Sequence, residues 1–357
     1  MNKIFKYFTI YCAILLFSFI SLEIALKIYS KYLKISFLND NRFSNIYRVY
    51  DQGEIFQSYK NFFLYKKNLD QKRYLSFYYD KKNKTFEKIW DYKFSTNNYG
   101  LMQKFSLEKN KKSILFLGDS FTEGQGAEPW IDNLGQEYNG YQVINGGIQG
   151  TGFRQFENLH NFLSQTLDIH KLVVIFISSD IRRKIELATN HKCLLNYNNC
   201  NSNNMMFGIP KGKEFNIEKF ILEKINLKQK YDLKKKIIYF VRNLYIYQYS
   251  RSIINKYRLK NDQNIKINLK SIINLKKKYR DDIIFIRIND PGEIMFKKKS
   301  YETEIIDKFF KKKKLKYYFC DMDQNLSLFH DYDYHPNAKG YEILRKCVQN
   351  ILDINFK

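Results

Sequence analysis

The stretch SILFLGDSFTEG, residues 113–124, decides the fold of this chain. A short apolar run ends at Gly118, where glycine lets the chain turn sharply, and Ser120 then falls at the start of the next helix. Free backbone N–H groups and the helix dipole favour developing negative charge at such a place. The motif alone is weak evidence, because an ordinary N-cap serine has the same surroundings. Its meaning depends on the residues that come after the other apolar runs of the chain.

Similar short apolar runs recur along the chain and alternate with helical segments. They are Ile114–Leu117, Tyr141–Ile144, Leu172–Ile177, Ile283–Ile288 and Lys316–Cys320. Runs that are short and rich in β-branched or aromatic residues are typical of buried strands, and their alternation with helices indicates successive βαβ units. We therefore predict an α/β fold in which about five parallel strands are covered by helices on both faces.

The sequence divides into three parts by pattern. Residues 1–35 hold an apolar segment, and residues 36–110 are aromatic and charged, with strand-like pieces closed by an Asn-Gly turn. Residues 111–357 carry the alternating pattern, interrupted by an insert at about residues 185–265. We interpret the second part as a membrane-proximal, β-rich extension that packs against the third.

The N-terminal apolar segment is long enough for a membrane span. Tyr7–Leu22 carries no charge, and Ile24–Leu26 extends the run past Glu23. About 20 residues at ~1.5 Å each give roughly 30 Å, the thickness of a bilayer core. A cleaved signal peptide needs a shorter apolar region and a small-x-small cleavage site, which residues 21–25 do not offer. We predict a single-pass anchor in a bacterial inner membrane, with the main domain on the periplasmic side.

The net charge of +25 raises the question of a nucleic-acid partner. The lysines are spread along the chain, and the abundance of Lys, Asn, Ile, Phe and Tyr is typical of an AT-rich genome. RNP-like, zinc-finger and helix-turn-helix patterns are missing from the sequence. We therefore interpret the charge as a solvated basic surface and expect no nucleic-acid partner.

Two of the five cysteines lie close together in a polar loop. A disulfide between Cys193 and Cys200 suits an oxidising compartment, although two free thiols or a weak metal site with His191 remain alternatives. Cys320 and Cys347 fall in a predicted core strand and a predicted core helix. We predict one disulfide in the loop, no metal and no cofactor.

Four glycines come after the second apolar run, in NGGIQGTG at residues 145–152. They allow backbone N–H groups to approach a ligand closely, as an oxyanion site or a phosphate site requires. A dinucleotide fingerprint does not fit, because the glycine spacing differs and the loop comes after the second strand instead of the first. In an open parallel sheet this loop lies beside Ser120, since working groups collect at the carboxyl ends of the strands.

A histidine with nearby carboxylates comes after the last apolar run, in DYDYHPNAKGY at residues 331–341. Asp331 and Asp333 stand four and two residues before His335. A carboxylate fixed near Nδ1 holds the tautomer in which Nε2 can take a proton from a serine. We expect Asp333 to be that carboxylate, because a residue two before the histidine can reach it across a tight turn.

This order of blocks resembles the GDSL/SGNH hydrolase family over about residues 113–353. The resemblance implies a flavodoxin-like three-layer α/β/α fold with Ser120 as nucleophile, His335 as base and Asp333 as acid. It also implies that the backbone N–H groups of Ser120 and Gly150 hold the oxyanion. The Asp-x-His spacing is similar to that of members related to alginate and other polysaccharide O-acetylation proteins. The commoner Asp-x-x-His spacing would need an acid one residue earlier.

The turn after the third strand departs from the family. Members usually have a Gly-x-Asn-Asp-like turn whose Asn donates to the oxyanion, whereas ISSDIRR at residues 177–183 places Asp180 at that position. An ionised Asp cannot donate, and losing one such donor costs roughly 2.7–4 kcal/mol. Arg182, Arg183 or Ser179 supplies the missing group, or the enzyme is slow. In a further alternative, Asp180 only pairs with Arg183 at a helix start.

The combined pattern predicts a serine-dependent ester hydrolase or transacylase acting on acyl groups of cell-envelope glycans or lipids. Ser120 would attack the acyl carbonyl, with His335 as base and then acid, and water or a sugar hydroxyl would resolve the acyl-enzyme. The alternative is a catalytically weak protein of this fold that holds a glycan or assists polysaccharide modification. Asp180 favours that alternative, and the intact serine, histidine and aspartate disfavour it.

Overall fold

The computed structural model describes residues 3–29, 45–50, 55–59, 62–80, 83–183, 206–208, 244–322 and 325–356, with a few positions between 216 and 242. The chain forms two compact units, one of Met1–Asn41 with Asn226–Asn261 and one of Arg42–Ile225 with Asp262–Lys357. The predicted pair Cys193 and Cys200 lies outside the described residues.

The first unit contains helices α1 (Lys3–Tyr29) and α7 (Tyr245–Asn261). Within α1, residues Phe5–Tyr29 are long and apolar enough to cross a membrane. The one acidic residue of α1, Glu23, accepts hydrogen bonds from the backbone N–H groups of Tyr245 at 2.6 Å and Ile246 at 2.9 Å. The carboxylate therefore caps the first turn of α7, where backbone donors have no partner inside the helix. The charge that interrupts the apolar run thus has a structural role.

The second unit is built on a six-stranded sheet in the order β12-β11-β9-β6-β8-β7. Five strands are parallel: β6 (Ser113–Gly118), β8 (Tyr141–Gly147), β9 (Ile169–Phe176), β11 (Ile283–Ile288) and β12 (Tyr318–Cys320). The two-residue β7 (Glu137–Tyr138) adds an antiparallel edge. Numbered along the chain, the parallel strands lie in the order 2-1-3-4-5, which is the flavodoxin-like arrangement. The predicted fold class is confirmed, and each of the five predicted runs overlaps one of these strands.

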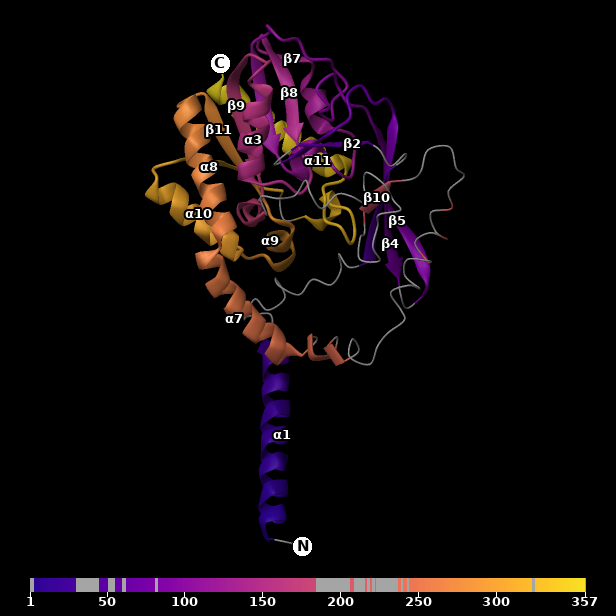
Figure 1. The fold of residues 1–357 in the computed structure, drawn as a ribbon, viewed down its shortest axis with the longest axis vertical. Coiled ribbons are helices and arrows are strands. Elements are labelled where there is room, and N and C mark those ends of the chain that lie inside the picture. The colour runs from indigo at the N-terminus through magenta and orange to yellow at the C-terminus, as the bar shows by residue number, and fades with distance from the viewer. Residues whose placement is uncertain are drawn as a thin grey trace. The chain divides into compact units, whose positions relative to one another are not determined.

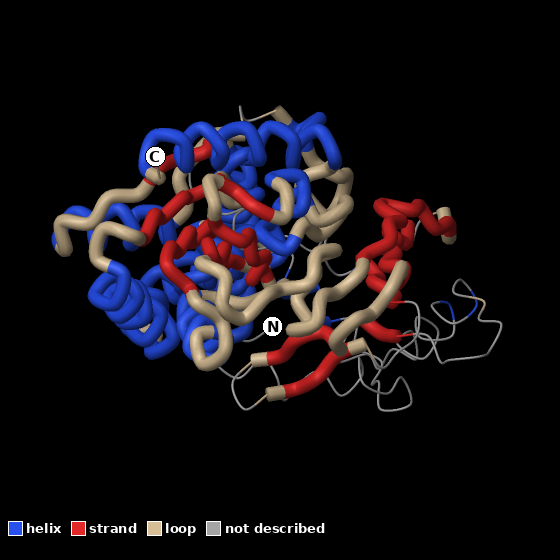
Figure 2. The backbone as a smooth tube through the Cα atoms, turned by 90° about the horizontal axis from the view of Figure 1, so that it is seen from above, coloured by secondary structure: helices blue, strands red, loops and turns tan. Residues whose placement is uncertain are grey.

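Helices cover both faces of this sheet (Figures 1 and 2). They are α3 (Phe153–Leu163), α8 (Gln263–Tyr279), α9 (Pro291–Phe296), α10 (Tyr301–Lys312) and α11 (Ala338–Asn355). On one face, Leu344 and Val348 of α11 share a core with Ile114 and Phe116 of β6. On the other, Phe176 packs its ring against Phe153 of α3 and Phe310 of α10. Because alternate side chains of a buried strand point to opposite faces, both layers need apolar residues, which explains the continuous apolar runs.

A second sheet comes mainly from the extension, in the order β10-β1-β4-β5. Its strands are β1 (Ile46–Tyr50), β4 (Lys72–Asp80), β5 (Thr85–Phe94) and β10 (Met206–Gly208). The insert contributes β10, which pairs parallel to β1. A separate hairpin joins β2 (Phe56–Ser58) and β3 (Phe63–Tyr65). The extension and the α/β part belong to one compact unit.

The Asn-Gly turn at residues 97–100 connects the extension to the α/β part. The Asn97 side chain accepts hydrogen bonds from two backbone N–H groups of the turn, at 2.9 and 3.1 Å. Gly100 has φ +79°, and a Cβ there would lie 2.2 Å from the carbonyl oxygen of Tyr65. Only glycine meets both conditions. Just beyond, the Gln103 side chain donates to the carbonyl of Val143 on β8 at 2.8 Å, which joins this segment to the central sheet.

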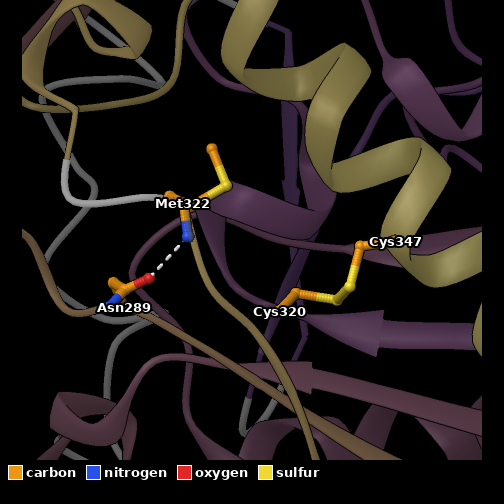
Figure 3. The surroundings of a disulfide bond; sticks show 4 residues. All are labelled: Asn289, Cys320, Met322 and Cys347. Atoms are coloured by element: carbon orange, nitrogen blue, oxygen red, sulfur yellow. Dashed lines mark hydrogen bonds between the residues drawn. A yellow bond between two sulfur atoms is a disulfide. The ribbon is translucent and has the colours of Figure 1, made fainter.

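A disulfide joins Cys320 at the end of β12 to Cys347 in α11 (Figure 3). Cys320 and Cys347 lie in a strand and a helix as predicted, but their bond was not predicted: α11 packs back on the sheet and brings the two Cα atoms to 5.9 Å. That separation lies within the range that a disulfide spans. The backbone beside it is fixed as well, since the Met322 N–H donates to the Asn289 side chain at 2.9 Å.

We expect Cys320 and Cys347 to be found as one linked peptide pair when protein isolated without reductant is digested and analysed by mass spectrometry. Closing a loop of this length restricts the unfolded chain, so replacing both residues by serine should lower stability by about 3.5 kcal/mol in denaturant unfolding. Cys12, which is free, serves as the internal control for complete alkylation. Finding both cysteines alkylated to the same extent as Cys12 would contradict the bond.

Candidate active site

The helix α2 (Ser120–Glu123) begins directly after β6, as the motif predicts. Asp119 precedes it, and its Oδ1 accepts a hydrogen bond from the Phe121 N–H at 3.0 Å, which caps the helix. A Cβ on Gly147 of β8 would lie 2.1 Å from the backbone nitrogen of Glu123, so glycine there lets α2 pack closely on the sheet. Ser120 is 5% exposed and stands at the carboxyl ends of the central strands.

Ser120, His335 and Asp333 lie together in the structure. His335 Nε2 is 2.9 Å from Ser120 Oγ, and Nδ1 of the same ring contacts Asp333 Oδ1. A ring that donates Nδ1–H to a carboxylate has its lone pair on Nε2, where it can accept the serine proton. Asp331 is exposed to solvent, whereas Asp333 is 1% exposed.

Two tyrosines in the left-handed conformation shape the loop that carries these residues. Tyr332 has φ +66° and Tyr334 has φ +60°. Left-handed backbone is uncommon for residues other than glycine and concentrates where the surrounding structure holds it. The loop is closed by the His330 N–H, which donates to the carbonyl of His335 at 2.9 Å. The backbone thus turns around Asp333, the residue between the two tyrosines.

The extension contributes an arginine that the sequence did not reveal. Arg48 of β1 donates to Asp333 Oδ2 at 2.6 Å, across 285 residues of sequence. Burial alone would raise the pKa of Asp333, but Arg48 and His335 outweigh it and hold that pKa well below its usual range. Trp90 of β5 lies close to both partners, with its ring 5.8 Å from the Arg48 guanidinium and 5.7 Å from the His335 ring. Arg48 stands in a strand-like segment without a motif, so no local signal pointed to it.

Gly150 occupies the turn after β8, in the glycine loop. It has φ +70°, and a Cβ built on it would meet no atom within 4 Å. Around it, the Ile148 N–H donates to the Gly118 carbonyl at 3.0 Å and the Thr151 N–H donates to the Ile148 carbonyl at 3.3 Å. The loop is therefore tied to the end of β6, and Gly150 faces open space.

Asp180 lies in the short 3-10 helix η4 (Ser178–Arg182) and is fully buried. Its Oδ2 accepts from the Ile177 N–H at 3.2 Å, so the side chain closes the turn after β9. Arg183 Nε lies 3.5 Å from Asp180 Oδ1, while Arg182 pairs with Glu302 at 3.3 Å. Of the two arginines considered from the sequence, Arg183 is the one beside Asp180. A carboxyl group with no exposed surface has no face for a substrate.

Asp119 and Asp180 form a buried carboxyl pair beside Arg183. Arg183 also approaches Asp119 Oδ2, at 3.7 Å. Burial raises the pKa of both carboxyl groups, each is affected by the other, and Arg183 offsets the effect only in part. Asp119 Oδ2 and Asp180 Oδ1 otherwise have no hydrogen-bond partner. Arg183, at 3.5 and 3.7 Å, therefore places one positive charge next to both carboxyl groups.

A second buried carboxyl group joins α2 to the extension. Glu123 Oε1 accepts from the Tyr65 hydroxyl at 2.5 Å, and burial raises the pKa of Glu123 to about 8. The Gln149 side chain of the glycine loop donates to the Tyr50 hydroxyl at 2.5 Å and lies 3.4 Å from that of Tyr65. Tyrosines of the extension therefore contact both α2 and the glycine loop. No sequence pattern indicated this network, because aromatic strands are common in any sheet.

No protein-family model matches the sequence, and no curated protein matches it. Among solved structures, a GDSL-like lipase from Bacteroides thetaiotaomicron is 12% identical, with a TM-score of 0.33, over 70% of this chain and 90% of that one. A lipase/acylhydrolase from Enterococcus faecalis is 11% identical, with a TM-score of 0.35, over 68% and 95% of the two chains. An acetylxylan esterase from Geobacillus stearothermophilus is 14% identical, with a TM-score of 0.32, over 69% and 95%.

We expect Asp333→Asn to reduce ester turnover by about 10⁴-fold, because an amide favours the wrong tautomer of His335. Asp331→Asn is the matched control, since the same change two residues earlier falls on an exposed side chain and should have little effect. Steady-state kinetics on a chromogenic acetate ester would measure both. A crippled Asp331→Asn variant with a mild Asp333→Asn variant would show that the wrong carboxylate has been assigned.

Glu123 should make stability depend on pH. Because its pKa is about 8 in the folded protein and near 4.5 otherwise, its stabilising contribution is complete below about pH 4.5 and is lost as the pH rises toward 8. Between pH 5 and 8, the free energy of unfolding should therefore fall more steeply in the wild type than in Glu123→Gln. Denaturant titrations would test this, with the exposed Glu128→Gln as control. Equal slopes in wild type and Glu123→Gln would refute it.

Proposed function

We propose that this protein is a serine-dependent ester hydrolase or transacylase of the GDSL/SGNH type. One observation carries the proposal: His335 Nε2 lies 2.9 Å from Ser120 Oγ while its Nδ1 contacts the buried Asp333. A nucleophile and base in hydrogen-bond reach, with the base oriented by a third group, is the signature of nucleophilic catalysis. Their position at the carboxyl ends of the parallel strands agrees with where this fold carries its sites.

The proposed reaction proceeds through an acyl-enzyme. Ser120 Oγ attacks the acyl carbonyl carbon while its proton passes to His335 Nε2. The tetrahedral intermediate collapses as His335 returns that proton to the leaving alcohol, and the acyl group stays on the serine. Water or a sugar hydroxyl then attacks, and the same proton transfers run again to free the serine. Asp333 stays ionised throughout and stabilises the imidazolium.

The oxyanion would be held by backbone N–H groups at the start of α2 and at Gly150, which faces open space. The complete burial of Asp180 argues against that carboxyl group as a neighbour of the oxyanion. Ser179 is 8% exposed, so its hydroxyl is a better candidate for a side-chain donor at η4. Arg183, paired with the Asp119 and Asp180 carboxyl groups, would compensate their charge. The reason to prefer a catalytically weak glycan-holding protein is thereby weakened.

The substrate we propose is an acylated glycan or lipid of the cell envelope, and the site would face the periplasm. The N-terminal helix is long and apolar enough to tether the enzyme to a membrane. A disulfide between Cys320 and Cys347 suits an oxidising compartment. Both features support an enzyme that works next to a membrane, outside the cytoplasm.

We expect a fluorophosphonate probe to label the wild type but not Ser120→Ala, because the probe needs an activated serine. Turnover of a chromogenic acetate ester should fall by at least about a thousandfold in Ser120→Ala. Ser106→Ala, which removes an exposed hydroxyl elsewhere, is the control and should behave as the wild type. Equal labelling of wild type and Ser120→Ala would overturn the nucleophile assignment.

A further inference from the structure

Arg48 belongs to the extension, yet its guanidinium reaches the acid–base loop of the proposed enzyme. We propose that Arg48 is a positioning residue that fixes Asp333, and through it His335, so that the extension is a working part of the site and more than a spacer. This inference rests on the proposed function, because it takes Asp333 and His335 as the acid–base pair.

The two oxygens of Asp333 have separate partners. Oδ1 contacts His335 Nδ1, and Oδ2 accepts from Arg48 at 2.6 Å. The Asp333 side chain has no exposed surface, so water has no access to hold it in place. If the Asp333 carboxylate rotated about its Cβ–Cγ bond, Oδ1 would lose its contact with His335 Nδ1. With Arg48 on the second oxygen, the rotation that breaks one contact breaks both.

The positive charge of Arg48 also affects the protonation of Asp333. An isolated buried carboxylate tends to take up a proton, and a protonated Asp333 would no longer orient the neutral imidazole in the required way. Arg48 and His335 together keep Asp333 ionised. The Arg48 side chain is itself 23% exposed, so the pair is weakly screened by solvent.

The extension also holds the residue next to Asp333. The ring of Tyr332 stacks on that of Tyr78 of β4, with centroids 3.9 Å apart and planes 1° from parallel. The Tyr332 hydroxyl donates to Glu87 of β5 at 2.8 Å. Because Tyr332 has a left-handed backbone, it needs contacts that keep it there. Two successive loop residues, Tyr332 and Asp333, are therefore held by the extension sheet.

Trp90 limits where the guanidinium can go. Its ring lies 5.8 Å from the Arg48 guanidinium carbon, within the range of a cation–π contact, and 5.7 Å from the His335 ring at an interplanar angle of 79°. Arg48, Trp90 and His335 are thus packed together. A lysine at position 48 would keep the charge but not the planar fork that fits this arrangement.

The full-length protein in detergent micelles provides the test. We expect Arg48→Met to lower kcat about a hundredfold with little change in KM, because the base is misplaced while substrate contacts remain. Arg48→Lys should retain more activity than Arg48→Met. Added methylguanidinium should restore part of the lost activity of Arg48→Met. The acidic limb of the pH–kcat profile should move to higher pH, because loss of the Arg48 charge makes it easier for the Asp333–His335 pair to take up a proton. Arg73→Met, which removes an exposed arginine of β4 paired with Asp91, is the matched control.

The results separate the alternatives. A raised KM with unchanged kcat would make Arg48 a substrate contact and overturn the positioning role, as would full activity in Arg48→Met. Near-UV circular dichroism checks folding, and if Arg48→Met does not fold, Arg48→Lys decides by the same kinetic and pH readouts. If the wild type has no Ser120-dependent activity, the proposed function fails but Arg48 is still testable. The low-field proton resonance of His335 Nδ1–H should then be present in the wild type and lost in Arg48→Met, and its persistence would overturn the inference.

Discussion

The buried carboxylate of Asp333 is the constraint on which the rest of the site depends. Removing a charge from water costs several kcal/mol unless partners replace the lost hydration, and a buried pair is stable only when its geometry is good. Asp333 obtains one partner, His335, from its own loop and the other, Arg48, from a strand 285 residues away. The pair that we propose for acid–base chemistry is therefore complete only when the extension sheet and the central sheet have both folded.

The same dependence extends to the Ser120 side of the proposed site. Tyr65 and Tyr50 of the extension contact Glu123 behind Ser120 and Gln149 in the glycine loop. Buried hydroxyl, amide and carboxyl groups must satisfy one another, since an unmade hydrogen bond inside a protein costs about 1–3 kcal/mol. The extension thus contacts the site at the serine helix, the glycine loop and the acid–base loop. A segment interpreted from the sequence as a membrane-proximal extension packed against the main domain thus supplies side chains to the proposed site.

How far the sequence could predict this structure depends on how local each physical signal is. The five parallel strands and the places of Ser120 and His335 were predictable, because each rests on a short apolar run and the few residues after it. Arg48 and the bond between Cys320 and Cys347 were not predictable. The Arg48–Asp333 contact and the disulfide both depend on which distant elements pack together. The residues next to Arg48, Cys320 and Cys347 in the sequence do not indicate those contacts.

The surroundings of Asp180 also depend on contacts that the sequence does not predict. From the sequence, we expected Asp180 to stand where its negative charge would oppose the oxyanion of the proposed reaction. In three dimensions it is buried against Asp119, with Arg183 near both carboxyl groups. Arg183 opposes the charge of these carboxyl groups, so in the proposed reaction they repel a developing oxyanion less than an unpaired Asp180 would. Asp119 also caps α2, and so the same buried cluster fixes the start of the helix that carries Ser120.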